Sequence, residues 1–273
     1  MKTQQGLLDE AVFARTASLF AVKRQVFAPE AVQALASDIV RRLSTTSHLN
    51  ARIDDSKISE VEIAAFCDVL IESDPSSALK FIAARRLEGV TRQGVYLGYV
   101  CAAARMLGQR WDEDRLSLFE VTTGTGHLYA LMRAMRAGGP TVSLKLDVDR
   151  SALFATVPGE DHGIGITVAA DLFRDQGWHI DLQTDTSHDS LMARVERTQP
   201  TIIGLSLSTE NRLDALVRLV VAMRLAVPHA IIGVAPGSDL DGSVVLKLVD
   251  IDLLFDDART AFTELDRLIR LRS

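Results

Sequence analysis

Residues 151–165 read SALFATVPGEDHGIG, and this stretch decides the fold class. Residues 153–157 form a short apolar run of the kind found in buried strands, and a loop rich in turn residues follows it. A helical pattern begins at about residue 163. A strand that passes through a glycine-rich loop into a helix is the repeating unit of parallel sheets, so we expect an α/β domain here.

The rest of the second half repeats this unit. We expect strands at 153–157, 180–183, 201–206, 230–234 and 251–255, and helices at 163–176, 187–198, 210–226, 240–248 and 257–271. The alternation predicts a doubly wound parallel sheet, which binds ligands beyond the carboxyl ends of its strands. The loops after Val157, Ser206 and Val234 are therefore the expected site.

The first half is helical throughout. We expect helices at 7–25, 29–44, 57–72, 76–88, 91–110 and 116–137, and the second half begins after Gly138-Gly139-Pro140. The last four helices predict a four-helix bundle. The predicted organisation is a helical extension at 1–55, a four-helix domain at 56–140 and the parallel-sheet domain at 141–273.

Composition excludes several classes of function. The 273 residues carry a formal net charge of -6 and no run of Lys or Arg, which does not favour direct binding of nucleic acid. Cys67 and Cys101 have no metal-binding spacing and are expected to be reduced core thiols. The chain shows no signal peptide and no apolar run of ~20 residues, so we expect a cytoplasmic protein without a membrane segment. No catalytic constellation stands out, so we expect no enzymatic activity.

His162 is the candidate metal ligand, because it follows the first strand directly. A neutral imidazole is a good ligand for a transition metal, and a neighbouring carboxylate, Glu160 or Asp161, can orient it. Gly163 and Gly165 would let a bulky planar ligand approach the backbone. A histidine in a glycine-rich turn without any ligand is the alternative that these residues leave open.

Three sequence elements resemble cobalamin-binding domains. Glu160-x-His162-x-x-Gly165 is similar to their D-x-H-x-x-G motif, with Glu in place of Asp. Their S-x-L element corresponds to Ser206, with Ser208 in place of Leu, and their Gly-Gly element appears only as Gly233-Val234. All three elements follow expected strands in the family's order, which makes the resemblance specific.

The resemblance implies that cobalamin binds with its base detached from cobalt. His162 would then be the lower axial ligand of the cobalt, oriented by Glu160 or Asp161. Ser206 and Ser208 would contact the nucleotide tail of the cofactor, and Gly233 would make room for it.

The helical half also carries a resemblance. The segments 107–111 and 116–120 are similar to the helical bundle that caps the upper corrin face in this family, and Trp111 would be part of the cap. DNA-binding adenosylcobalamin photoreceptors have Glu-His-His where this chain has Val121, Thr122 and Thr123. The sequence around these positions instead resembles stand-alone cobalamin-binding antirepressors of photosynthesis-gene control in purple bacteria, and their haem-binding relatives.

Residues 122–126 are unusually small for a helix. A flat tetrapyrrole pressed against Val121, Thr122 and Thr125 would explain this, and so would close packing of helices. The residues leave both explanations open. We expect His127 to be a core or solvated histidine and Asp256-Asp257 to cap the last helix.

These observations lead to three functional hypotheses. The first is a light-responsive regulator that binds adenosylcobalamin or another form of cobalamin and acts through a protein partner such as a transcriptional repressor. The second is a sensor of haem or of the linear bilin biliverdin, alone or together with cobalamin. The third is a corrinoid carrier for methyl transfer. A homodimer is compatible with each of them.

Overall fold

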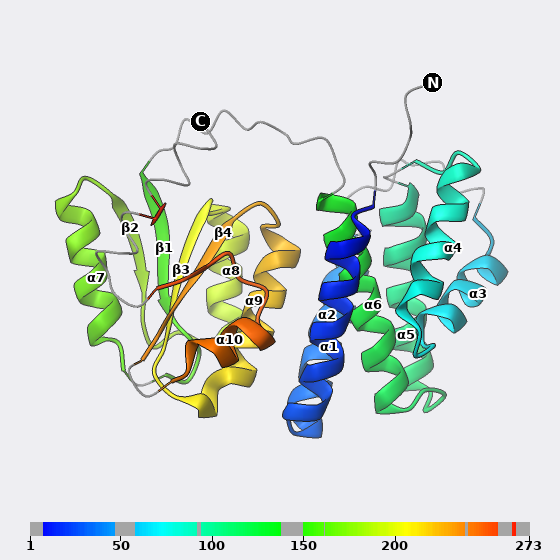
Figure 1. The fold of residues 1–273 in the computed structure, drawn as a ribbon, viewed down its shortest axis with the longest axis horizontal. Helices are drawn as coiled ribbons and strands as arrows, with labels where there is room; N and C mark the ends of the chain where they lie inside the picture. Colours follow the sequence, from blue (N-terminus) through cyan, green and yellow to red (C-terminus); the bar gives the residue numbers. More distant parts are fainter. Residues whose placement is uncertain are drawn as a thin grey trace. The chain divides into compact units, whose positions relative to one another are not determined.

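A computed structural model describes residues 8–46, 58–91, 94–137, 150–160, 162–237, 240–255 and 264–265. The chain divides into two compact units, Met1–Pro140 and Thr141–Ser273. The first is helical and the second is α/β, which confirms the predicted fold class (Figure 1). None of the described helices is long and apolar enough to cross a membrane.

The first unit contains six α-helices and one π-helix among its described residues. They are α1 (Glu10–Val26), α2 (Pro29–Thr46), α3 (Glu60–Leu70), α4 (Pro75–Leu87), the π-helix η3 (Gly94–Cys101), α5 (Ala102–Asp112) and α6 (Leu118–Ala137). Polar side chains define several helix starts, because Asp9, Ser59 and Asp74 each accept a hydrogen bond from a backbone N–H of the first turn. The predicted single helix at 91–110 consists in the structure of the π-helix η3 followed directly by α5.

The two N-terminal helices belong to the core of this unit. α1 packs along α6, and α2 packs against α5 and α6. The Phe20 ring of α1 lies 5.5 Å from the Tyr129 ring of α6, and both side chains are buried. The sequence predicts that residues 1–55 form an extension ahead of a four-helix bundle. In the structure, the apolar faces of α1 and α2 are instead buried against the later helices.

The second unit is built on a five-stranded parallel sheet in the order β2-β1-β3-β4-β5. Its strands are β1 (Ser151–Thr156), β2 (His179–Gln183), β3 (Ile202–Leu207), β4 (Ile231–Pro236) and β5 (Leu253–Leu254). Its helices are α7 (Ile164–Asp175), α8 (His188–Thr198), η4 (Glu210–Arg212, a 3-10 helix), α9 (Leu213–Ala226) and α10 (Gly242–Leu248). The expected helix at 257–271 lies outside the described residues, apart from 264–265.

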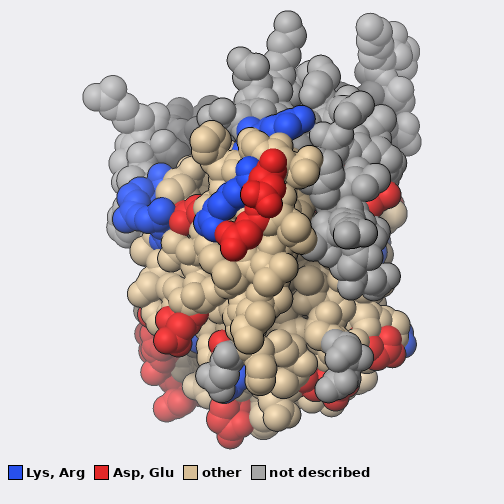
Figure 2. All heavy atoms as spheres, turned by 90° about the vertical axis from the view of Figure 1, so that its left-hand side faces the viewer, with Lys and Arg blue, Asp and Glu red and all other residues tan. Residues whose placement is uncertain are grey.

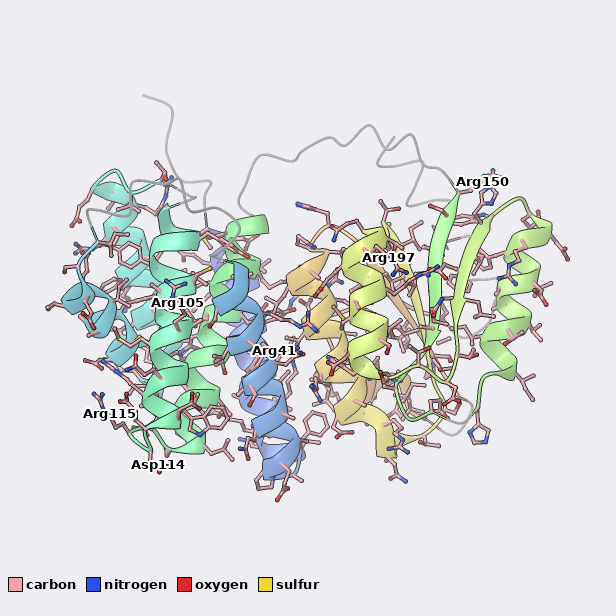
Figure 3. All side chains as sticks on the ribbon, turned by 180° about the vertical axis from the view of Figure 1, so that it is seen from behind. Arg41, Arg105, Asp114, Arg115, Arg150 and Arg197 are labelled. Carbon is pink, nitrogen blue, oxygen red and sulfur yellow. The ribbon has the colours of Figure 1, made fainter. Side chains whose placement is uncertain are left out.

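Helices cover both faces of this sheet, with α7 on one side and α8 and α9 on the other (Figures 1 and 3). Residues paired in register on neighbouring strands point to the same face of the sheet, so Phe154 of β1 and its partner Gly204 of β3 share a face. Phe154 packs edge-on against Phe173 of α7, with ring centroids 5.1 Å apart, so this is the α7 face. Burial on both faces explains why the strands read as continuous apolar runs.

The strand order reverses between β1 and β3. Connections leave these two neighbouring strands toward opposite faces of the sheet, which opens a crevice beyond their carboxyl ends. The loop that holds His162 follows β1, and the loop that holds Ser208 follows β3. The topology therefore brings together the two loops that the sequence selected.

Candidate functional site

The loop after β1 is a short, well-bonded turn. The Val157 N–H donates to the Ser206 carbonyl at 3.1 Å, and the Glu160 N–H donates to the Val157 carbonyl at 2.9 Å. Gly159 has a φ of 80°, in the left-handed region that favours glycine. The turn leaves His162 just before α7, with 74% of its side chain exposed.

Glu160 connects this loop to the loop after β3. One carboxylate oxygen, Oε1, accepts the backbone N–H of His162 at 3.2 Å and lies 3.1 Å from Nδ1 of the same residue. The other, Oε2, accepts the backbone N–H of Ser208 at 2.8 Å. The Glu160 side chain is buried, whereas the imidazole it contacts is exposed. One carboxylate thus fixes the position of His162 relative to the end of β3.

The charge of Glu160 determines which imidazole nitrogen is free. Burial by itself would raise the pKa of this carboxyl, but the hydrogen bonds from Ser208 and His162 outweigh burial and leave the pKa below its ordinary value. The ionised carboxylate can only accept hydrogen bonds, so Nδ1 of His162 carries the proton that it donates. In the neutral imidazole, Nε2 then keeps its lone pair, which is the arrangement of a metal-ligating histidine.

A cavity with a volume of about 400 Å³ opens beside His162 on the α7 face of the sheet. Three aromatic rings, those of Phe154, Phe173 and Phe255, form part of its wall. Its floor includes Gly204 of β3, and its remaining described lining residues are mostly aliphatic. This volume lies within the ~300–1,000 Å³ of typical ligand pockets.

Two glycines of neighbouring strands leave room for aromatic rings of the cavity wall. A Cβ atom on Gly204 would lie 2.9 Å from the Phe154 ring, and one on Gly233 would lie 2.3 Å from the Phe255 ring. Gly204 and Gly233 are register partners in β3 and β4. Gly233 therefore accommodates the ring of Phe255, and it does not line the cavity, so the prediction that it makes room for a ligand tail is corrected.

The glycine that lies at the end of β4 is Gly237. The strand runs to Pro236, beyond the expected end at residue 234, so Gly233 lies well before its end. A Cβ atom on Gly237 would come within 3.0 Å of the Ser208 backbone, and Gly237 lines the cavity. The Pro236-Gly237 turn signal at the end of an apolar run was the feature that could have identified this residue.

Ser206 places a buried hydroxyl group at the cavity. Its hydroxyl Oγ is buried and has no hydrogen-bond partner among the described residues, and Ser206 lines the cavity. A buried polar atom without a partner costs free energy unless a ligand or water satisfies it. Ser208 lines the same cavity, and its backbone N–H is the one held by Glu160.

The rim next to His162 is apolar. Ile164, in the first turn of α7, lines the cavity and is 82% exposed. Figure 2 shows the side of the molecule on which α7 lies, and uncharged residues form most of its middle. Gly165, in the first turn of α7, has open space where a Cβ atom would lie and lines the cavity. Gly163 is the N-cap residue of this helix.

The small residues of α6 are explained by helix packing. A Cβ atom on Gly124 would lie 3.0 Å from Leu107 of α5, and one on Gly126 would lie 2.9 Å from Phe20 of α1. The expected ligand contacts Val121, Thr122 and Thr125 are buried, and both threonine hydroxyls donate to carbonyls of their own helix. Of the two explanations left open by the sequence, the structure favours packing.

The other predicted residues lie in varied settings. Trp111 is half-buried near the end of α5, before the turn in which Asp114 adopts a left-handed φ of 55° (labelled in Figure 3). His127 is a core histidine whose Nδ1 lies 2.8 Å from the Leu70 carbonyl oxygen. Asp161 and the segment 256–257 lie outside the described residues. Among the residues described, no group of three or more His, Cys, Asp or Glu could hold a metal ion.

Comparison with known families gives a match within the second unit. Residues 150–265 match the model of the B12 binding domain, and this supports binding of cobalamin or a related corrinoid. The matched range contains the loop of His162, the strand of Ser206 and the cavity between them.

Individual relatives are distant. An uncharacterized 20.5 kDa protein in the bchF-crtJ intergenic region of Rhodobacter capsulatus is 24% identical over 142 residues, which is 49% of this chain and 74% of that protein. Similar solved structures include a cobalamin-binding protein from Desulfitobacterium hafniense (16% identity, 76% of this chain, 98% of that one, TM-score 0.40). The monomethylamine corrinoid protein of Methanosarcina barkeri is also similar (11% identity, 77% and 100%, TM-score 0.36). So is the methanol:cobalamin methyltransferase complex of that organism (12% identity, 92% and 92%, TM-score 0.38).

Proposed function

We propose that this chain is a cobalamin-binding regulator in which His162 is the lower axial ligand of cobalt. The observation that carries the proposal is the hydrogen-bond network from Ser208 through Glu160 to Nδ1 of His162, which leaves Nε2 of an exposed imidazole free beside the cavity. The match of this region to the B12 binding domain supports the same ligand.

The residues present fit the cofactor. A corrin supplies four nitrogen ligands to cobalt, so the protein needs to add only one imidazole below the ring. The exposed apolar side chain of Ile164 at the cavity rim suits contact with a large macrocycle, and the cavity suits a detached nucleotide base. The unpartnered hydroxyl of Ser206 would bind a polar atom of that base.

We further propose that the output is regulatory rather than enzymatic. A bound alkylcobalamin supplies a cobalt–carbon bond that light breaks, and a protein whose contacts depend on the upper ligand can convert this loss into a change of state. The antirepressor-like segment at Phe119–Thr122 and the acidic net charge favour a protein partner, such as a transcriptional repressor in the cytoplasm, over DNA.

Absorption spectroscopy of the purified chain tests this proposal. The chain is incubated separately with adenosylcobalamin, haem and biliverdin, freed of unbound ligand, and measured in the dark and after illumination. We expect retention of the corrinoid and a light-induced spectral change. Retention of haem or biliverdin without cobalamin would support the tetrapyrrole-sensor hypothesis. Photolysis of the bound corrinoid with no change in the circular dichroism or the size-exclusion elution of the chain would support a carrier.

His162→Ala tests the ligand assignment. Within the described part of the chain, the exposed imidazole is hydrogen-bonded to Glu160 alone, so the fold should survive its removal. We expect weaker cobalamin binding and a shift of the absorption bands that depend on the axial ligand. His179→Ala is the control, because His179 is also exposed but lies at the start of β2. Unchanged spectra in His162→Ala would refute the assignment.

A further inference from the structure

Few of the described residues that line the cavity carry a polar side chain. Among the described residues that line it, the only polar side chains are those of His162, Ser206 and Ser208, and none is Asp, Glu, Lys or Arg. The imidazole of His162 already engages Glu160 through Nδ1 and is largely exposed. The described part of the wall therefore offers a ligand two hydroxyl groups within an otherwise apolar surface.

This wall distinguishes between kinds of nucleotide base. Corrinoids differ in the base of their nucleotide tail, which is a benzimidazole in some and a purine such as adenine in others. A benzimidazole detached from cobalt has one acceptor nitrogen and an apolar ring system. A detached adenine has several ring acceptors and an exocyclic amine, and each of these loses its bonds to water when the base is buried.

Ser206 matches the first kind of base and not the second. Its Oγ is a single buried hydroxyl without a partner among the described residues, so it can satisfy one acceptor nitrogen. The rings of Phe154, Phe173 and Phe255 would pack against the apolar part of a benzimidazole. Against adenine, the same rings would leave the amine and further acceptors unpaired.

We propose that this cavity selects corrinoids with a benzimidazole base over corrinoids with a purine base. The inference rests on the proposed function, because it takes the cavity as the place where the nucleotide tail binds. It goes beyond that function in naming the class of corrinoid that the chain accepts.

Equilibrium titration of the full chain with three corrinoids tests the selection. The ligands are cobalamin, which has dimethylbenzimidazole, the adenine-containing cobamide, and cobinamide, which has no base. We expect cobalamin to bind about tenfold or more tightly than the adenine form, because an unpaired buried polar group carries a penalty of this order. Equal or tighter binding of the adenine form would overturn the selection and leave cobalamin binding intact. Failure of all three to bind would refute the proposed function itself.

A pair of variants on α7 locates the origin of the selectivity. Ala169 lines the cavity, so Ala169→Ser adds a hydroxyl to its wall, whereas Val168→Ser adds one on the exposed side of the same helix. We expect only Ala169→Ser to lower the affinity ratio of cobalamin to the adenine form, by about threefold. The cost of detaching each base from cobalt cancels in this comparison between proteins. An unchanged ratio in Ala169→Ser, or an equal change in both variants, would overturn the assignment to this cavity.

Discussion

At the residue scale, a substitution of Ser206 should affect the binding of cobalamin but not that of haem or biliverdin. Ser206→Leu places a larger apolar side chain in the cavity and removes the unpartnered hydroxyl. Haem and biliverdin carry no nucleotide tail, so we expect the variant to lose cobalamin affinity while any binding of those ligands persists. Titration of both proteins with cobalamin and haem measures this. Equal losses for the two ligands would show that the residue does not contact a tail.

His127 gives a second prediction at this scale, for stability against pH. Burial lowers the pKa of this histidine below its ordinary value of about 6.5, against an opposing hydrogen bond to the Leu70 carbonyl. As the pH falls below that value, the unfolded chain takes up a proton before the folded one does. The associated stability is therefore present above about pH 6.5 and is lost as the pH falls through the lowered folded pKa.

His127→Asn tests this linkage, because the amide keeps a hydrogen-bond donor and does not titrate. We expect its free energy of unfolding to change less than that of the native chain between about pH 7.5 and about pH 5.5. Urea denaturation at the two pH values provides the measurement. His179→Asn, at an exposed position, should retain the native dependence. An unaltered slope in His127→Asn would mean that another group titrates.

At the scale of elements, α6 is a packing helix. Gly124→Leu improves helix propensity but places its side chain against Leu107 and Ile71, where a Cβ atom alone would come within 3.0 and 3.5 Å. Overpacking of this kind costs about 1–3 kcal/mol. We therefore expect the ligand-free variant to melt at a lower temperature while cobalamin affinity stays near the native value.

A helical glycine in open space is the matched control. A Cβ atom on Gly165 of α7 would meet nothing within 4 Å, so Gly165→Ala should not lower the melting temperature of the ligand-free chain. If Gly124→Leu melted normally and lost cobalamin affinity instead, the small residues of α6 would have to contact the ligand.

At the scale of the whole molecule, two compact units predict two unfolding transitions. Each unit has its own core, and the proposed site lies entirely within the second. Calorimetry should resolve both transitions. Free cobalamin at a hundred times its Kd should stabilise only one of them, by about 2.7 kcal/mol. A single transition that shifts as a whole with ligand would show instead that the units unfold together.

The sequence by itself determined the two-part architecture and the candidate metal-ligating residue, His162. The spacing of apolar residues distinguishes helices from strands, because the two have periods of 3.6 and 2 residues. The alternation of strands and helices then implied a parallel sheet, and the order of motifs along the chain selected the loops of His162 and Ser206. Local patterns are sufficient for these conclusions, because strand ends in a parallel sheet meet at one edge.

Only the tertiary structure decided what each small residue accommodates. Gly233 matched a motif in the sequence, yet its lack of a side chain accommodates the Phe255 ring, whereas Gly204 and Gly237 lie at the cavity. Gly124 and Gly126 accommodate side chains of neighbouring helices. The first two helices pack against the later helices of the same unit. A glycine in the sequence indicates that a larger side chain would not fit at that position. It does not show which neighbouring group occupies the space, since that neighbour comes from a distant part of the chain. That information exists only once strands are in register and helices are packed.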